Sequence, residues 1–335
     1  MTLDQGTQKH VPRSKSEPKV ASNMETVDMS QRYNFLRELS SSKFGTVCLV
    51  EDKWAKAKIC LKVFTKSEVK IADFNREYQI SYFLSPHPNV LDTYPGIYCT
   101  TDSYFFVQEV YGTTLRTVVE STKSGLNEAD ATQVLQQVAD ALEFLHDRHF
   151  VHTSLSPANI LVYDKSFSKV KISDFSNTRL VGTVVRNCAV VTTPWEAPEM
   201  CELLEKERYT VESALDVWAF GIISYYVLNR KYPWMKASIT SRNYWEWEQW
   251  IKKKTILPVK WTKFTDKALK MFKRTLHPKA KERCSMAKAK RYLRDKWIKN
   301  MKVSEPVFAE SFLLTIGGVL FTGDVQRSDM QDRSE

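Results

Sequence analysis

The chain has 335 residues, of which 43% are hydrophobic and 26% charged, with 10 glycines and 12 prolines. This composition excludes a collagen-like, low-complexity or wholly disordered chain. The length fits about two domains of ~150 residues or one large two-lobed domain. The net charge of +10 is concentrated, because residues 251–302 hold 19 Lys and Arg against three acidic residues. The rest of the chain is therefore mildly acidic.

Neither cysteine spacing nor apolar runs point to an extracellular or membrane protein. The six cysteines form no CxxC pair and no zinc-type spacing, so we expect reduced thiols. Residues 1–30 lack a basic-then-apolar leader. The most apolar run, 311–321, is shorter than the ~20 residues that span a bilayer, and it predicts a docked strand or helix. We expect an intracellular, cytoplasmic protein with no transmembrane segment, and the nucleus is left open.

The predicted elements change character along the chain. Residues 1–31 are polar and without apolar periodicity, which predicts a disordered N-terminal tail. Short β-type runs predict strands at 34–39, 46–52, 57–64 and 104–110. Helical spacing predicts a helix over 72–84 and another over 128–148, after which helical patterns dominate. The pattern indicates an α+β chain with two lobes joined near residues 110–112.

Several motifs that are weak alone occur in a fixed order. They are Gly45 before Val47, Lys62 at a strand end, Glu77 on the next helix, His152-Thr153-Ser154-Leu155-Ser156-Pro157-Ala158-Asn159, Asp174-Phe175-Ser176, Ala197-Pro198-Glu199 and Asp216-Val217-Trp218-Ala219-Phe220-Gly221. Their order and separation resemble the eukaryotic protein kinase superfamily. The stretches 216–221, 232–234, 244–250 and 264–272 are most similar to the Src-homology-3-binding serine/threonine kinase family.

This resemblance implies a bilobal α+β fold over residues 32–298, with a β-rich N-lobe to about residue 110 and a helical C-lobe after it. Residues 1–31 and 299–335 would be tails. It also implies ATP and Mg²⁺ as cofactors, because metal ions and fixed charges stabilise the phosphates during transfer. The alternative is that the chain retains the family's nucleotide pocket but binds no nucleotide in it.

The resemblance assigns a role to each matching position. Lys62 would bind the α- and β-phosphates and pair with Glu77, while Asn159 and Asp174 would hold magnesium. The remaining nucleotide-binding positions are Ser40, Ser42, Gly45 and Val47 in the phosphate-covering loop, Cys60 and Leu161 against adenine, and Glu109 and Tyr111 at the hinge, whose backbone would meet the ring edge. Glu199 is predicted to pair with Arg283, and Asp216 to hold the backbone around His152.

The departures from the family pattern concern catalysis. Ser154 stands where the family has the aspartate that accepts the substrate proton, and a positioned base contributes about 10²–10⁴ in rate. Thr153 replaces an arginine and Ser156 a lysine, and Ser40 and Ser42 replace two glycines of the phosphate loop. We predict a pseudokinase-like protein, with Ser154 as a degenerate base position, that binds ATP and acts through partners. An active Ser/Thr kinase with an atypical loop and a scaffold that binds no nucleotide are the alternatives.

The basic segment 251–302 suggests a partner. Its charges recur at helical spacing, as in Lys267, Lys270, Lys273, Arg274, Arg283, Lys288, Arg291 and Arg294. A solvated helix face is one interpretation, and a docking face for an acidic signalling protein or an anionic membrane is the other. No DNA- or RNA-binding signature is present, so nucleic acid is not expected. No two prolines lie three apart, so the chain offers no PxxP ligand.

Overall fold

The computed structural model describes residues 24–42, 45–187 and 193–299. Residues 1–23 of the predicted N-terminal tail and the predicted C-terminal tail beyond residue 299, with the apolar run 311–321, lie outside the described residues. Predictions about those parts stay predictions.

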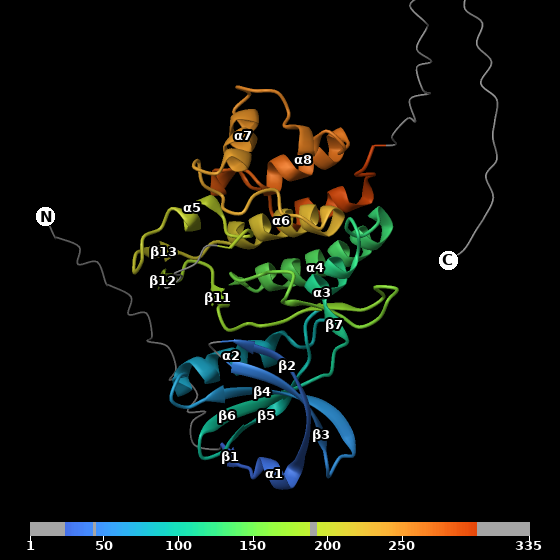
Figure 1. The fold of residues 1–335 in the computed structure, drawn as a ribbon. Coiled ribbons are helices and arrows are strands. Elements are labelled where there is room, and N and C mark those ends of the chain that lie inside the picture. The colour runs from blue at the N-terminus through green and yellow to red at the C-terminus, as the bar shows by residue number, and fades with distance from the viewer. Residues whose placement is uncertain (1–23, 43–44, 188–192, 300–335) are drawn as a thin grey trace, which may run out of the picture. The chain divides into compact units, whose positions relative to one another are not determined.

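A six-stranded sheet forms the N-terminal lobe, drawn in blue to blue-green in Figure 1. Its strands are β1 (Glu25–Thr26), β2 (Tyr33–Ser42), β3 (Gly45–Asp52), β4 (Ala57–Thr65), β5 (Thr93–Cys99) and β6 (Ser103–Gln108), in the order β1-β5-β6-β4-β3-β2. All neighbours pair antiparallel except β1 and β5. The four predicted strands are confirmed. β5 was missed because Pro95 and Gly96 interrupt its β-type pattern.

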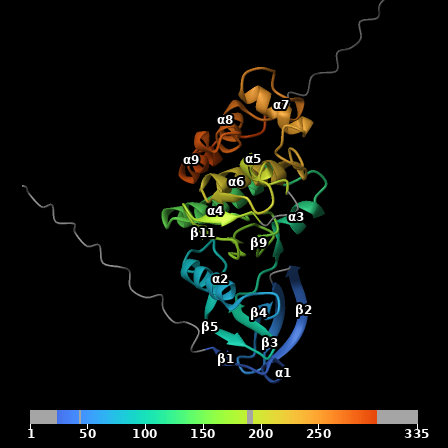
Figure 2. The same cartoon turned by 90° about the vertical axis from the view of Figure 1, so that its left-hand side faces the viewer.

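Helix α2 (Ile71–Leu84) packs on this sheet and confirms the predicted helix over 72–84. Its buried face includes Phe74, whose ring lies 5.2 Å from that of Phe64 and 5.9 Å from that of Phe106. Figure 2 shows α2 on the side of the sheet that adjoins the helical lobe. Glu77 lies on the same buried face, so the packing that seats α2 also aims this carboxylate at the sheet.

Two short elements lie inside the range predicted as a tail. Besides β1, helix α1 (Met29–Arg32) forms there, and the carboxylate of Asp28 accepts hydrogen bonds from its first free N–H groups. Val27 is buried against Tyr33 and Phe105. Residues 24–31 are therefore ordered by packing on the sheet, which the composition of the whole 1–31 range concealed.

The helical lobe is built around one fully buried helix, α6 (Ala214–Asn229). The helices of this lobe are α3 (Leu115–Ser121), α4 (Glu128–Asp147), α5 (Pro198–Cys201), α6, α7 (Arg242–Ile251), α8 (Asp266–Thr275) and α9 (Met286–Arg291), with 3₁₀ turns η2 (Val259–Trp261), η3 (Ala280–Glu282) and η4 (Tyr292–Arg294). A Cβ on Gly221 would lie 2.6 Å from Thr275 Oγ1, so α6 and α8 approach too closely there for a larger residue. Trp218, Trp234 and Trp261 fill the space beyond with rings in tilted contact.

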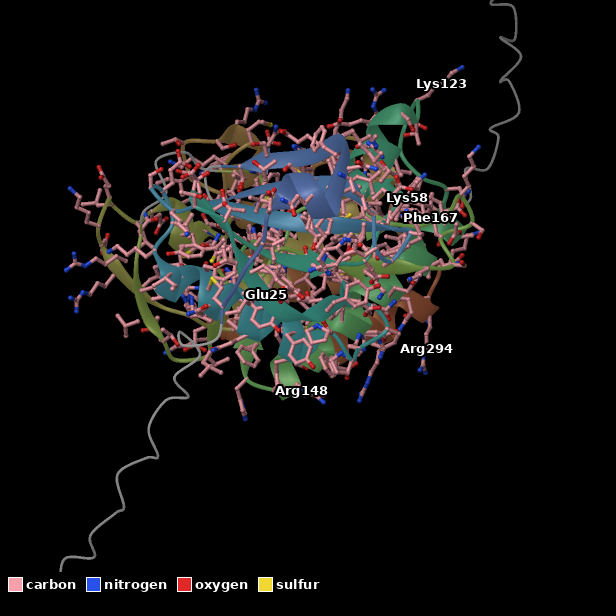
Figure 3. The ribbon with its side chains drawn as sticks, turned by 90° about the horizontal axis from the view of Figure 1, so that it is seen from below. Glu25, Lys58, Lys123, Arg148, Phe167 and Arg294 are labelled. Atoms are coloured by element: carbon pink, nitrogen blue, oxygen red, sulfur yellow. The ribbon has the colours of Figure 1, made fainter. Side chains whose placement is uncertain are left out.

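Short strands between the lobes hold the loops of the candidate site. They are β7 (Thr113–Thr114), β8 (Phe150–Val151), β9 (Ile160–Val162), β10 (Val170–Ile172), β11 (Arg179–Leu180), β12 (Val184–Arg186) and β13 (Arg208–Thr210). β9 pairs with β10 and β7, and β8 pairs with β11. The loop between β8 and β9 therefore begins beside the end of the loop between β10 and β11, and ends beside its start. Seen from the N-terminal lobe (Figure 3), charged side chains such as Lys123 and Arg148 project outward from the rim of the molecule.

Candidate active site

Three charged side chains from separate elements meet between the lobes. Lys62 on β4 donates hydrogen bonds to Glu77 on α2 and to Asp174 after β10, the latter at 2.9 Å. Lys62 and Glu77 are 8% and 4% exposed. Burial alone would lower the pKa of Lys62, but Asp174 and Glu77 raise it above its ordinary value. Lys62 is therefore a fixed positive charge at the junction of the lobes, with the predicted Glu77 pairing formed.

Asp174 and Asn159 present oxygen atoms beside this lysine. Asp174 Oδ1 accepts from Lys62 and, at 2.9 Å, from the Ser176 hydroxyl, while no hydrogen bond from the residues that the structure describes reaches Oδ2. Burial alone would raise the pKa of Asp174, but Lys62 and Ser176 lower it to about 2, so the group is a carboxylate at neutral pH. Asn159 Nδ2 donates to the Ser154 carbonyl at 3.0 Å, which leaves the amide oxygen available.

These two side chains fit the requirements of magnesium. Mg²⁺ prefers hard oxygen ligands and keeps several waters, so one carboxylate, one amide oxygen and substrate phosphates suffice. Within residues 24–42, 45–187 and 193–299 no group of three or more His, Cys, Asp or Glu side chains forms an all-protein metal cage. The donor set therefore suits a phosphate-bridging ion rather than a structural one.

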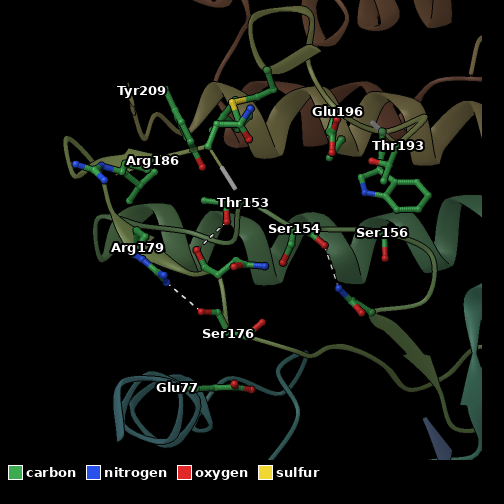
Figure 4. Close-up of a pocket in the computed structure, with 18 of the residues that line it drawn as sticks. Glu77, Thr153, Ser154, Ser156, Ser176, Arg179, Arg186, Thr193, Glu196 and Tyr209 are labelled. Atoms are coloured by element: carbon green, nitrogen blue, oxygen red, sulfur yellow. Dashed lines mark hydrogen bonds between the residues drawn. The ribbon is translucent and has the colours of Figure 1, made fainter. Parts of the chain in front are cut away.

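The loop after β8 is rigidly held, but it carries a hydroxyl where the resemblance expects a carboxylate. Both oxygens of the buried Asp216 accept from this loop, Oδ2 from the His152 N–H at 2.8 Å and Oδ1 from the Thr153 N–H at 2.9 Å. The predicted anchoring role of Asp216 is confirmed. The Ser154 hydroxyl lies 3.5 Å from His152 Nδ1 and lines the cavity shown in Figure 4 with Ser156.

The β2–β3 hairpin and the hinge lie close together on the other side of Lys62. Ser40 pairs with Val47 and Ser42 with Gly45 in the hairpin, and the Ser42 hydroxyl donates to the Gly45 carbonyl at 3.0 Å. The Tyr111 hydroxyl contacts the Ser40 side chain. The Ser40 side chain therefore ties the predicted phosphate loop to the hinge, while the Ser42 hydroxyl bonds within the hairpin.

The predicted adenine-binding residues Cys60 and Leu161 are both buried. Burial raises the pKa of the Cys60 thiol to about 12, against the lowering effect of a hydrogen bond from the Tyr111 backbone. Leu161 lies at the centre of the small β7–β9–β10 sheet, opposite Thr114. The thiol thus faces the hinge N–H that was predicted to meet the ring edge.

Glu109 has a second role that sequence reasoning did not identify. Its carboxylate accepts hydrogen bonds from Lys171, from Lys169 at 3.0 Å and from the Asp92 N–H at 2.8 Å. Burial alone would raise the pKa of Glu109, but these bonds hold it below its usual range. Because its own N–H donates to the Asp92 carbonyl, Glu109 can offer a nucleotide only its backbone oxygen. The side chain instead ties the hinge to β10.

A cavity of 720 Å³ opens between α2, the loop after β8 and the segment before α5. Glu77, Ser154 and Asn159 line it. So do six charged residues that the sequence analysis missed: Glu68, Asp73, Arg76, Arg179, Arg186 and Glu196. Burial and the nearby charge of Arg76 lower the pKa of Arg179. The sequence could have identified Arg76 as a residue of this cavity, because it is the neighbour of the predicted site residue Glu77 on α2. The cavity therefore holds more charged side chains than we expected from Thr153, which stands where the family pattern has an arginine.

The basic segment does not form one solvent-facing stripe. Arg283, assigned to it by spacing, is buried and binds Glu199, so that part of the prediction is wrong, while the predicted Glu199–Arg283 pair is confirmed. Lys267 pairs with Asp295 at 2.6 Å and Lys290 with Glu143 at 2.8 Å. These lysines are therefore paired with acidic residues of the chain itself. Residues 300–302 of the segment lie outside the described residues.

A two-lobed fold with a lysine, a glutamate and an aspartate joined across its cleft defines a class of phosphate-transferring proteins. The family model described as the protein kinase domain matches residues 33–298. The chain therefore belongs to the protein kinase family, and the predicted α+β fold is confirmed.

Three of the similar proteins carry names of serine/threonine kinases. The Caenorhabditis elegans protein C01C4.3, which carries the name of a serine/threonine-protein kinase, is 42% identical over 84% of this chain and 71% of its own length. Serine/threonine-protein kinase SBK1 of Danio rerio is 36% identical over 83% of this chain and 72% of its own. SBK1 of Mus musculus is 34% identical over 74% and 60%. The chain is a member of the serine/threonine kinase family.

No helix among the described residues combines the length and the apolar character that crossing a membrane requires.

Proposed function

We propose that this chain binds Mg-ATP and transfers its phosphate to serine or threonine only slowly, acting mainly through the conformation that the nucleotide stabilises and the partners it holds. The observation that carries the proposal is a contrast within one site. The Lys62–Glu77–Asp174 group is assembled, whereas the neighbouring base position holds Ser154, a hydroxyl instead of a carboxylate. Binding and positioning are therefore supported better than proton removal.

Each residue has a defined task in this proposal. Lys62, held protonated by two carboxylates, would neutralise charge on the α- and β-phosphates. Asn159 and Asp174 would hold a magnesium ion, which supplies charge neutralisation of the phosphate oxygens when bound. Tyr111 and Ser40 would close the hairpin over the base. Ser154 cannot take a proton from the substrate hydroxyl as an aspartate would, because a hydroxyl is too weak a base near neutral pH.

Asp174→Ala is expected to remove most of the stabilisation that Mg-ATP gives the full chain. A ligand at 100 times its dissociation constant stabilises a protein by about 2.7 kcal/mol, which corresponds to a rise in Tm of about 5–10 °C. The measurement is a thermal shift with and without Mg-ATP, with Asp102→Ala as an exposed control. If Mg-ATP leaves the Tm of the unmodified chain unchanged, the scaffold alternative replaces this proposal.

A second candidate, genuine if slow phosphotransfer, is favoured by the contact between Ser154 and His152. His152 Nε2 lies 3.0 Å from the Ser173 carbonyl, which can only accept, so Nε2 carries the proton and Nδ1 a lone pair. As the substrate hydroxyl attacks phosphorus, its proton would pass to Ser154 Oγ while the Ser154 proton passes to Nδ1. The products are the phosphorylated hydroxyl, ADP and the imidazolium of His152, beside the Asp216 carboxylate.

This relay predicts that Ser154→Ala lowers the rate of phosphotransfer about tenfold or more relative to the unmodified chain. The loss should be smaller than the factor of about 10²–10⁴ that a well-placed base contributes, because the relay is a weaker base. The measurement is radiolabelled phosphate transfer to a Ser/Thr peptide. Ser156→Ala removes a hydroxyl from the same loop and should leave the rate unchanged. Equal rates for the unmodified chain and Ser154→Ala would exclude the relay.

A further inference from the structure

A surface at the far end of the helical lobe takes no part in the proposed kinase site. Helix α7 ends at Ile251, and residues 252–258 lead from it into η2. Figures 1 and 2 both show this loop at the end of the helical lobe opposite the N-terminal sheet. Residues 252–259 are called the tip below.

The tip exposes two aliphatic side chains almost completely. Ile256 is 89% exposed and Val259 is 86% exposed. Between them, Leu257 and Pro258 are partly buried and attach the tip to the lobe. A single exposed aliphatic residue needs no explanation, but two on one protruding loop present a combined apolar surface to the solvent. Because so little of either side chain is covered, this surface is convex and forms no groove.

Positive charge borders this apolar surface. Residues 249–265 contain five lysines and no acidic residue. Lys252 pairs with Glu248 at 3.1 Å, whereas Lys253 and Lys254 form no ion pair with any residue the structure describes. The other glutamate of α7, Glu246, is paired with Arg242. The free charges of the tip are therefore both positive.

The backbone at Lys253 does not favour a lysine. Lys253 has φ of 59°, and its N–H donates to the Trp250 carbonyl while the Lys254 N–H donates to the Gln249 carbonyl. These two bonds form the helix-ending motif in which glycine is the usual residue at the left-handed position. Lys253 is exposed, so packing of the fold gives no reason for a lysine at this position, which it holds at some cost in backbone strain.

We propose that the tip docks on an anionic lipid membrane, with Ile256 and Val259 entering the boundary between headgroups and acyl chains and Lys252–Lys254 against the headgroups. A convex apolar surface would need a matching hollow in a protein partner, whereas a fluid bilayer yields around protruding side chains. Basic residues next to apolar ones gain from the negative potential of an anionic leaflet. The proposal sharpens the docking function predicted for the segment 251–302 and does not depend on nucleotide binding.

Co-sedimentation of the full chain with vesicles tests this docking. The chain should bind phosphatidylcholine vesicles that contain phosphatidylserine and not pure phosphatidylcholine, and binding should weaken with salt. The double variant Ile256→Ser/Val259→Ser should lower binding about tenfold or more. Lys253→Gly/Lys254→Ser should do the same, although glycine at position 253 relieves the backbone strain and should not lower stability. Matched controls are Leu204→Ser, at a side chain 74% exposed elsewhere, and Lys279→Ser/Lys281→Ser.

Three outcomes would overturn the proposal. They are equal binding to neutral and anionic vesicles, unchanged binding by both tip variants, and loss of binding only in the lysine variant. The last result, with displacement by soluble polyglutamate, would assign the tip to an acidic protein instead. All tip variants should keep the Mg-ATP thermal shift of the unmodified chain, so failure of membrane docking is separable from failure of nucleotide binding.

Discussion

Ser154→Asp is expected to raise the rate of phosphate transfer to a Ser/Thr peptide by about 10²–10⁴. The gain should be large because the surrounding geometry is already in place. Asp216 fixes the backbone of His152 and Thr153, and Asn159 binds the Ser154 carbonyl at 3.0 Å. A carboxylate at position 154 would project from this held backbone into the same cavity, beside the side chains that orient the phosphates. Radiolabelled transfer with saturating Mg-ATP measures the effect.

Ser156→Asp is the matched control, since it adds the same charge two residues away in the same loop. It should not raise the rate, because a carboxylate there would face the phosphate instead of the substrate proton. If Ser154→Asp keeps its Mg-ATP thermal shift but gains no activity, the loss lies elsewhere. The replacement of two glycines by Ser40 and Ser42 in the hairpin would then be the defect that limits transfer.

The fold and the charged group of the site could be predicted because both depend on local signals. Strand-forming runs and the helical spacing over 72–84 predicted most of the N-terminal lobe. The Pro- and Gly-containing β5 was missed, and so were β1 and α1 in the range predicted as a tail. The pairing of Lys62 with Glu77 was predicted from the order of motifs, whereas the ion pair of Lys62 with Asp174 was seen only in the structure. The magnesium, adenine and base roles of the other residues stay predictions, because their test needs nucleotide or activity.

What the sequence did not reveal depends on partners far away in the chain. Glu109 was assigned to the hinge by its position, but its ion pairs with Lys169 and Lys171 come from residues 60 and 62 positions later. Charge counting placed Arg283 in the basic stripe, although the family resemblance predicted its pair with Glu199, and the structure shows Arg283 buried in that pair. Composition cannot distinguish a paired, buried charge from a free one, so the unpaired lysines of the tip emerged only from the structure.

Arg283→Ala is expected to lower the stability of the chain by about 3–5 kcal/mol, which corresponds to a fall in Tm of about 6–20 °C. The Arg283 side chain is fully buried and binds Glu199 through two parallel bonds of 2.7 Å each. It also donates to the carbonyls of Ala214 and His277, both at 3.0 Å. Truncation would empty the space that the buried guanidinium fills and leave the carbonyls of Ala214 and His277 without this donor, while the Glu199 carboxylate, 36% exposed, would be left to water.

Two variants separate the ion pair from the packing of the arginine. Glu199→Gln keeps the size of the partner and removes its charge, so it should cost less than Arg283→Ala, because the bonds to Ala214 and His277 survive. Arg274→Ala, at an exposed arginine of α8, should change the Tm by less than about 2 °C, since surface substitutions stay within about 0.5 kcal/mol. A Tm for Arg283→Ala equal to that of Arg274→Ala would show that Arg283 does not anchor the helical lobe. An Arg283→Ala variant that melts early but shows the full Mg-ATP shift would assign the pair to stability alone, because Glu199 lies in α5 and not among the side chains that contact Lys62.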